Sequence, residues 1–167
     1  MTLGVLQVLA VMAVSVAMAL SLADALEFPG KKRLTKDAYC GMQAIYCPGF
    51  TFGGFGEPGA TILIVILLCL MPAGTMAFWL TLVSLVGLIL MQTVYWLVTH
   101  PVNGFWLRDQ NLGRFGSGFF SFGSARRRAA NPVKWTELRD RWEYSHVVRA
   151  GLAVASLAIL VTSVVVS

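Results

Sequence analysis

Apolar runs separated by polar stretches organise this chain. Four predominantly apolar runs are predicted to be helices, over residues 2–24, 58–72, 75–99 and 146–166. A helix needs about 20 mostly apolar residues to cross a hydrocarbon core about 30 Å thick, and the second run is short by that measure. A tight turn at Pro72-Ala73-Gly74 makes the second and third runs antiparallel neighbours. We therefore predict an all-α fold, a four-transmembrane-helix bundle that forms a single integral membrane domain over residues 1–167.

The ends of these helices are predicted from local signals. The first run has the length of a secretory signal peptide but lacks its basic leading segment, so we expect a retained helix. The third helix is predicted to end at His100, because the residue before Pro101 is biased away from helix. The last helix is predicted to begin at Asn131-Pro132, an N-cap residue followed by a first-turn proline. Its length of about 50 Å would extend its first half beyond the membrane core.

The two polar loops are expected at about residues 25–57 and 100–145. In the first loop, Phe28-Pro29-Gly30 predicts a turn, and Thr35 is a candidate cap of a short interfacial helix. The apolar face of that helix would carry Ala38, Met42, Ile45 and Tyr46. Segments 49–58 and 103–124 are rich in glycine and phenylalanine. They are either pliable connectors or the roof of a cavity for a hydrophobic substrate.

Composition and charge support a membrane protein. The chain is 57% hydrophobic and 13% charged, against about 25% charged residues in soluble domains, and its mean hydropathy is +0.72. The net charge of +5 does not indicate nucleic-acid binding, because every lysine and arginine lies in or beside the two loops, flanking apolar runs. By the positive-inside rule the loops are cytoplasmic and both termini lie outside the inner (plasma) membrane, on the periplasmic side. The last helix is then extended on the cytoplasmic side.

Motifs for bound groups are weak. Cys40 and Cys47 form a lone C-x6-C pair, which is a poor zinc motif, and a cytoplasmic disulfide is not expected. The glycine-rich segments lack the spacing of a phosphate-binding loop. These motifs therefore predict neither a metal site nor a particular cofactor.

Candidate chemistry gathers before and within the last apolar run. At about 100° per residue, one stripe of the helix carries Trp135, Leu138, Arg139, Trp142, His146 and Arg149. A charged stripe that turns inward needs partners at the same level of the bundle. The candidate counter-ions are Asp24, Glu27 and Glu57, and His100 and Asn103 leave the third helix nearby.

Three interpretations of this constellation remain open. In the first, Arg139 and Arg149 form ion pairs with the counter-ions, and the tryptophans anchor the interface. In the second, His146 is a general acid or base beside a carboxylate, and the two arginines hold an anionic or enolate-like oxygen. In the third, His100 and His146 join Glu27 or Asp24 in a metal site.

The closing motif W-x2-L-R-x-R-W-x3-H-x2-R, preceded by Asn131-Pro132 and by Asn103 after the third helix, resembles the anthrone oxygenase-like family of small four-helix membrane proteins. Residues 25–58 also look like bacterial members, many of which are described only as a domain of unknown function. The resemblance implies that relatives oxidise polycyclic anthrones to quinones with molecular oxygen. The residues that match are Asn103, Trp135, Arg139, Trp142, His146 and Arg149.

We therefore expect a membrane oxidoreductase that acts on a hydrophobic aromatic or quinone-like molecule in contact with membrane lipids. The expected catalytic residues are His146, Arg149 and Arg139, and the expected substrate-binding residues are Asn103, Trp135, Trp142 and His100. The alternative is a non-catalytic accessory or structural subunit of a larger membrane complex. A homo-oligomer is compatible with either function, and a transporter has little support because inverted repeats are missing.

Overall fold

The computed structural model describes residues 2–46, 49–106 and 134–167, and this part of the chain is helical without strands. Its elements are α1 (Thr2–Lys31), α2 (Lys36–Met42), the 3-10 turn η1 (Gln43–Tyr46), α3 (Gly49–Gly54), α4 (Gly56–Leu70), α5 (Met76–Val94), the π-helical turn η2 (Tyr95–Thr99), α6 (His100–Trp106) and α8 (Trp135–Val165).

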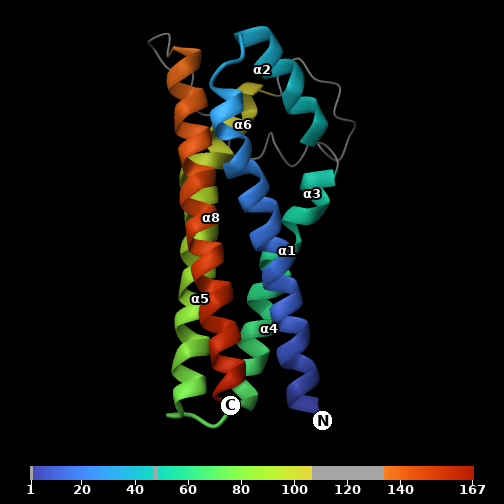
Figure 1. The fold of residues 1–167 in the computed structure, drawn as a ribbon, viewed down its shortest axis with the longest axis vertical. Helices are drawn as coiled ribbons and strands as arrows, with labels where there is room; N and C mark the ends of the chain where they lie inside the picture. The colour runs from blue at the N-terminus through green and yellow to red at the C-terminus, as the bar shows by residue number, and fades with distance from the viewer. Residues whose placement is uncertain (1, 47–48, 107–133) are drawn as a thin grey trace.

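Helices α1, α4, α5 and α8 lie side by side and alternate in direction (Figure 1). Helix α8 packs on both α1 and α5, and α4 packs on the same two neighbours. Both chain ends lie at one end of this bundle, whereas α2 and α6 lie at the opposite end (Figure 1). The predicted up-and-down order of the four apolar runs therefore appears in the structure.

Within the described residues, three helical segments are long and apolar enough to cross a membrane: Leu3–Lys31, Met76–Asn103 and Trp135–Val165. Helix α4 has only 15 residues and is about 22 Å long, less than the thickness of a hydrocarbon core. Large apolar side chains are exposed along the outer faces of the bundle, among them Val8, Met12, Ile62, Val83 and Val161. A surface of this kind suits lipid contact, as expected for a membrane protein.

Helix α1 continues beyond its predicted end. It runs through Phe28-Pro29-Gly30, where the sequence predicted a turn, and ends at Lys31. Near a helix end, Pro29 removes only one backbone donor, which is a small loss at that position. The extra turn carries the buried Lys31 side chain back toward Asp24 and Glu27. The predicted turn was wrong because contacts of Lys31 outweigh the local preference of Pro29.

The third apolar helix also passes its predicted stop. After the π-helical turn η2 it continues through Pro101 to Trp106, so the predicted end at His100 was wrong. Pro101 has no amide hydrogen to donate to the carbonyl of Leu97. Arg141 Nη2 of α8 lies 3.4 Å from that oxygen and donates to it instead. A neighbouring helix thus satisfies the backbone group that the proline leaves open.

Two helix starts bear on the sequence predictions. Thr35 caps α2 by accepting from the Ala38 amide at 3.4 Å, which confirms the predicted cap. The inward residue of α2 is Tyr39, whereas Ala38 of the predicted apolar face is exposed. The last helix begins at Trp135 after an extended Lys134, and the predicted start at Asn131-Pro132 lies outside the described residues.

Small and hydroxyl-bearing residues bring α5 and α8 close together. Thr81 and Ser163 share a buried hydrogen bond of 2.7 Å, and Ser84 Oγ donates to the carbonyl of Ser156 at 2.9 Å. Gly87 faces Ser156 at the same seam, where a Cβ atom on Gly87 would lie 2.1 Å from Ser156 Oγ. Such seams are typical of helix pairs in membranes, where close packing and hydroxyl hydrogen bonds replace the hydrophobic effect.

We predict that Gly87→Leu separates α5 from α8 and lowers the free energy of unfolding by about 1–3 kcal/mol, as overpacking does in protein interiors. Thermal unfolding in detergent, followed by circular dichroism, measures the change. Gly151→Leu on α8 is the matched control, because open space surrounds Gly151. Equal losses for the two variants would contradict a tight seam at Gly87.

Candidate functional site

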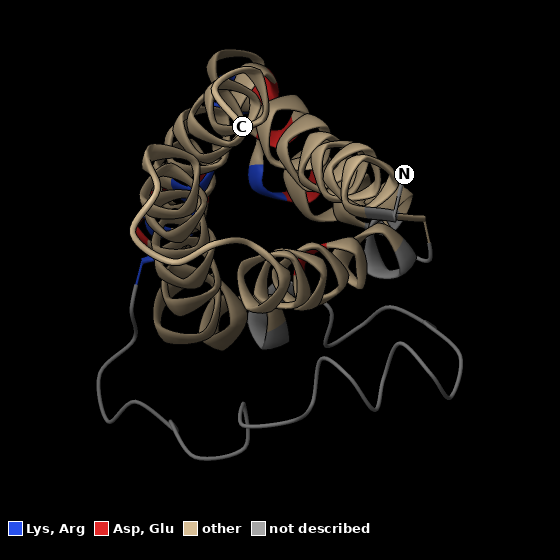
Figure 2. Ribbon diagram, turned by 90° about the horizontal axis from the view of Figure 1, so that it is seen from below, with Lys and Arg blue, Asp and Glu red and all other residues tan. Residues whose placement is uncertain are grey.

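The charged residues of the described chain lie toward the end of the bundle that is opposite the termini. Residues 1–23, 58–107 and 150–167 contain no aspartate, glutamate, lysine or arginine. In the view from the end that carries the termini, the near turns of the helices are uncharged and the coloured positions lie deeper (Figure 2). The buried charges and their partners, here called the ionic network, are Asp24, Glu27, Lys31, Tyr39, Tyr46, Glu57, Glu143, His146 and Arg149.

His146 and Asp24 form the centre of the network. His146 Nδ1 of α8 lies 3.1 Å from Asp24 Oδ2 of α1, and both residues are buried. Two lone pairs at this distance would repel, so we assign the hydrogen to Nδ1, which donates to the carboxylate. His146 Nε2 is then an acceptor, and it is buried without a hydrogen-bond partner among the residues that the structure describes. The Trp142 ring packs on the imidazole, with 4.1 Å between ring centroids.

Arg149 is the charged neighbour of His146 on α8. Its guanidinium pairs with the carboxylate of Glu57 at the start of α4, and both side chains are buried. Arg149 Nη1 also lies 3.2 Å from His146 Nδ1, but with the Nδ1 hydrogen directed to Asp24 neither nitrogen can accept, so this approach is not a hydrogen bond. The guanidinium lies over the Tyr95 ring at 5.0 Å. The predicted pair of Arg149 with a counter-ion is confirmed. Removing either partner would leave an uncompensated charge in an apolar setting.

Lys31 connects the carboxylates on the other side of His146. Its Nζ lies 3.0 Å from Glu27 Oε2 and 3.8 Å from both Asp24 Oδ1 and Glu143 Oε2. The side chain is only 2% exposed, and its ammonium lies over the Trp142 ring. From the sequence, Lys31 was expected only as one of the basic residues of the first loop. Its i,i+4 spacing from Glu27 was the available signal, but Pro29, two residues earlier, favoured a turn.

Two tyrosines complete the network from the segment after α1. Tyr39 donates its hydroxyl hydrogen to Glu143 Oε1 at 2.8 Å, and both side chains are fully buried. Burial raises the pKa of Tyr39 above its usual range, so the phenol stays neutral and can donate. Tyr46 donates in the same way to Glu27, and burial likewise raises the pKa of Tyr46. Sequence reasoning missed Glu143, which lies about 100° from Trp142 around α8, at the edge of the predicted stripe.

Arg139 does not join the network. Its Nη2 lies 2.8 Å from Asp140 of the same helix, and its guanidinium stacks over Trp135 at 5.2 Å. The predicted pairing of Arg139 with a carboxylate of another helix was therefore wrong. Asp140 is the next residue in the chain, so Arg139 pairs with it without any contact to another helix.

The remaining candidates fall into two groups. Asn103 contacts the tryptophan beside the network, because Trp142 Nε1 donates to Asn103 Oδ1 at 2.7 Å. His100 instead packs against the rings of Trp96 and Tyr95, at 4.9 and 5.8 Å between centroids. Among the described residues, no three His, Cys, Asp or Glu side chains are close enough to hold a metal ion. The metal site of His100, His146 and a carboxylate is therefore not assembled.

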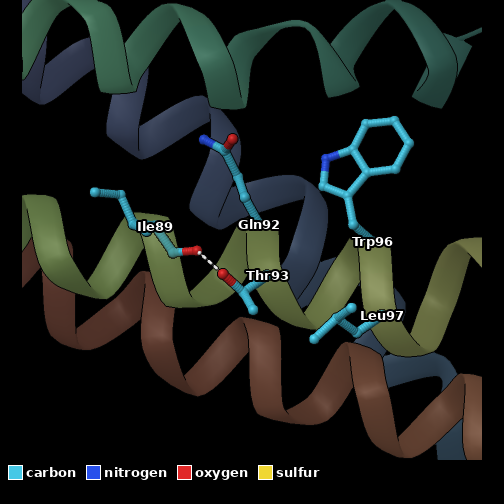
Figure 3. Close-up of a pocket in the computed structure, with 5 residues that line it drawn as sticks. All are labelled: Ile89, Gln92, Thr93, Trp96 and Leu97. Atoms are coloured by element: carbon cyan, nitrogen blue, oxygen red, sulfur yellow. Dashed lines mark hydrogen bonds between the residues drawn. The ribbon is translucent and has the colours of Figure 1, made fainter.

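A groove lies on the outer surface of α5 and η2. It has a volume of about 340 Å³ and is lined by Ile89, Gln92, Thr93, Trp96 and Leu97. The side chains of Gln92 and Trp96 extend toward α4, the uppermost ribbon in the close-up (Figure 3). Gln92 Nε2 donates to Thr61 Oγ1 at 2.7 Å and, over 3.4 Å, to the carbonyl of Glu57. This apolar groove thus adjoins the backbone of the residue that pairs with Arg149.

The arrangement has the parts of a proton acceptor in an apolar setting. A carboxylate orients the imidazole of His146 through Nδ1, and Nε2 remains to accept a proton. Arg149 provides a positive charge beside the ring.

Comparisons with protein-family models, curated proteins and solved structures found no match for this chain.

We predict that Glu57→Gln lowers the free energy of unfolding by about 3–5 kcal/mol, because it leaves Arg149 buried without a counter-charge. Denaturant titration in detergent measures the loss. Adding Arg149→Met to that variant should recover much of the stability.

The matched control is Asp140→Asn, which breaks the partly exposed pair with Arg139 and should cost less than about 1 kcal/mol. Similar costs for Glu57→Gln and Asp140→Asn would show that the buried pair has no special weight.

Proposed function

We propose that this protein is a membrane oxidoreductase in which His146 removes a proton from a hydrophobic aromatic substrate. The main observation that supports this proposal is the environment of the His146 ring. His146 Nδ1 is held by the Asp24 carboxylate, while Nε2 is buried and has no hydrogen-bond partner among the described residues. An imidazole oriented in this way is the usual arrangement of a general base.

The chemistry follows from the charges around the ring. A phenol or an anthrone that loses a proton to Nε2 becomes a phenolate or enolate, and Arg149 is the nearest cation to stabilise that oxygen. Electron-rich anions of this type react with molecular oxygen. For an anthrone, one O2 converts the substrate to the quinone and releases one water. The proposal assigns to this chain the proton transfer and the stabilisation of the anion, and it gives Arg139 no direct part.

The resemblance in the closing motif supports the choice of substrate class. Trp142, Asn103 and His146 of that motif meet in the structure, where Trp142 donates to Asn103 and its ring packs against the imidazole. A polycyclic substrate would pack against such an aromatic wall. The groove over Gln92 and Trp96 is the proposed entrance from the bilayer, since it is apolar and adjoins Glu57.

We further propose that α1, α4, α5 and α8 all lie in the inner membrane with the ionic network on the cytoplasmic side. The distribution of lysine and arginine supports this orientation. The short α4 would be accommodated by local thinning of the bilayer or by the preceding α3, from which only Phe55 separates it.

Fusions at the carboxyl end test the orientation. Alkaline phosphatase fused after Ser167 should be active, because that enzyme folds outside the cytoplasm, and green fluorescent protein at the same point should stay dark. A fluorescent carboxyl-terminal fusion together with an inactive phosphatase fusion would reverse the proposed orientation.

For the activity, we predict that His146→Gln lowers kcat for oxygen-dependent oxidation of anthrones or polycyclic phenols by at least about 100-fold, the usual contribution of a general base. The glutamine has a similar size but cannot accept and release the proton. Oxygen consumption by the purified protein in lipid nanodiscs, with quinone absorbance as a second readout, measures turnover.

Tyr144→Phe is the matched control, because the exposed Tyr144 ring lies on the same helix but outside the network. Equal turnover by wild type and His146→Gln would remove His146 from catalysis. If the protein instead purifies in gentle detergent with a stoichiometric partner and shows no turnover, the accessory-subunit function replaces the enzyme.

A further inference from the structure

The ionic network has more negative than positive charge around Lys31. Glu57 balances Arg149, so that pair is neutral. On the other side of His146, three carboxylates of Asp24, Glu27 and Glu143 share the single ammonium of Lys31. Buried net negative charge is costly, so this side of the network attracts a positive charge. The network is therefore suited to hold a proton that arrives at the imidazole.

One member of this group reaches solvent. The side chains of Asp24 and Glu143 are 8% and 0% exposed, whereas that of Glu27 is 48% exposed. Glu27 lies one helical turn after Asp24 on α1, on the same face. The path from the imidazole to the exposed carboxylate is therefore short and follows one helix.

We propose that Asp24, Lys31 and Glu27 form a proton route from His146 to the aqueous face, with Glu27 as its exit. This inference rests on the proposed role of His146 and extends it to the fate of the proton. The proton taken at Nε2 makes an imidazolium, which releases its Nδ1 proton to Asp24 Oδ2 over 3.1 Å. Asp24 then passes one proton to Glu27, and Glu27 releases it to water, so that both carboxylates return to their starting state and the imidazole keeps its hydrogen on Nε2. When Nε2 gives this hydrogen to the reduced oxygen, a proton from water returns through Glu27 and Asp24 to Nδ1, which restores the starting tautomer and supplies the second proton of the released water.

Lys31 is the positioning residue of this route. Its ammonium lies 3.0 Å from Glu27 and 3.8 Å from Asp24, close enough to hold both carboxylates and a water between them. The titratable and charged groups that face the route from the packed elements are Arg149 beside His146, Glu143 beside Lys31, Tyr46 on Glu27, and, one contact further, Tyr39 on Glu143 and Glu57 on Arg149.

Trp142 offers a readout that needs no substrate. Its ring centroid lies 4.1 Å from that of His146, and a protonated imidazole quenches a tryptophan in contact with it. The rate at which Trp142 fluorescence changes after a pH jump therefore reports how fast His146 gains or loses its proton. The fluorescence change that disappears in Trp142→Phe comes from Trp142. The part of that change that also disappears in His146→Gln reports the protonation of His146.

The experiment is a stopped-flow pH jump between about pH 8 and 5, a range that covers the usual titration of histidine, on the full-length protein in nanodiscs. We expect Glu27→Gln to slow the fluorescence change at least about tenfold while its amplitude stays. The glutamine remains able to contact Tyr46 and Lys31, and the half-exposed position tolerates the change. The control Glu137→Gln, an exposed carboxylate on α8, should match the wild-type rate.

Each other outcome overturns the route. An unchanged rate in Glu27→Gln removes the exit, and a changed amplitude at an unchanged rate shows that Glu27 acts only through its charge. A wild-type signal without a pH-dependent Trp142 component shows that His146 does not exchange protons. These results are separate from turnover: if His146→Gln stays active but Glu27→Gln slows the protonation of His146, the proposed function fails and the route stands.

Discussion

The structure depends on one constraint, which is that a charge in apolar surroundings must have a partner. The lower part of the bundle carries no charge along residues 1–23, 58–107 and 150–167, so charged side chains meet only at the other end. There the helices bring cations to carboxylates of neighbouring helices, Lys31 of α1 to Glu143 of α8 and Arg149 of α8 to Glu57 of α4. Because a buried charge without a partner costs several kcal/mol, these contacts fix how α1, α4 and α8 align at this end.

The same constraint explains why two helices pass their proline residues. Helix α1 continues through Pro29 because its last turn delivers Lys31 to the carboxylates. The third apolar helix continues through Pro101 because Arg141 of α8 satisfies the Leu97 carbonyl, and the continuation places Asn103 against Trp142. In both cases a contact from distant sequence offsets the hydrogen bond that the proline removes.

The difference between local preference and contacts from distant sequence also determines how much of the structure the sequence could predict. Hydrophobic runs located the long helices, and helical periodicity turned Trp142, His146 and Arg149 inward as observed. Periodicity cannot choose among possible partners of a side chain. It therefore predicted a carboxylate of another helix as the counter-ion of Arg139, whereas Asp140 of the same helix is the observed partner. Lys31 was missed because local turn chemistry suggested that α1 had already ended. Tyr39 and Glu143, 104 residues apart, meet only through the tertiary fold.

The two halves of the ionic network differ in a way that pairing alone does not explain. Arg149 and Glu57 form a neutral pair that connects α8 to the start of α4. Around Lys31 the carboxylates outnumber the cation, and a network that only joined helices would gain stability by losing one of them. The surplus lies beside the one imidazole whose outer nitrogen has no partner in the described chain. A surplus of buried acid next to an unpartnered base fits proton transfer better than helix packing alone.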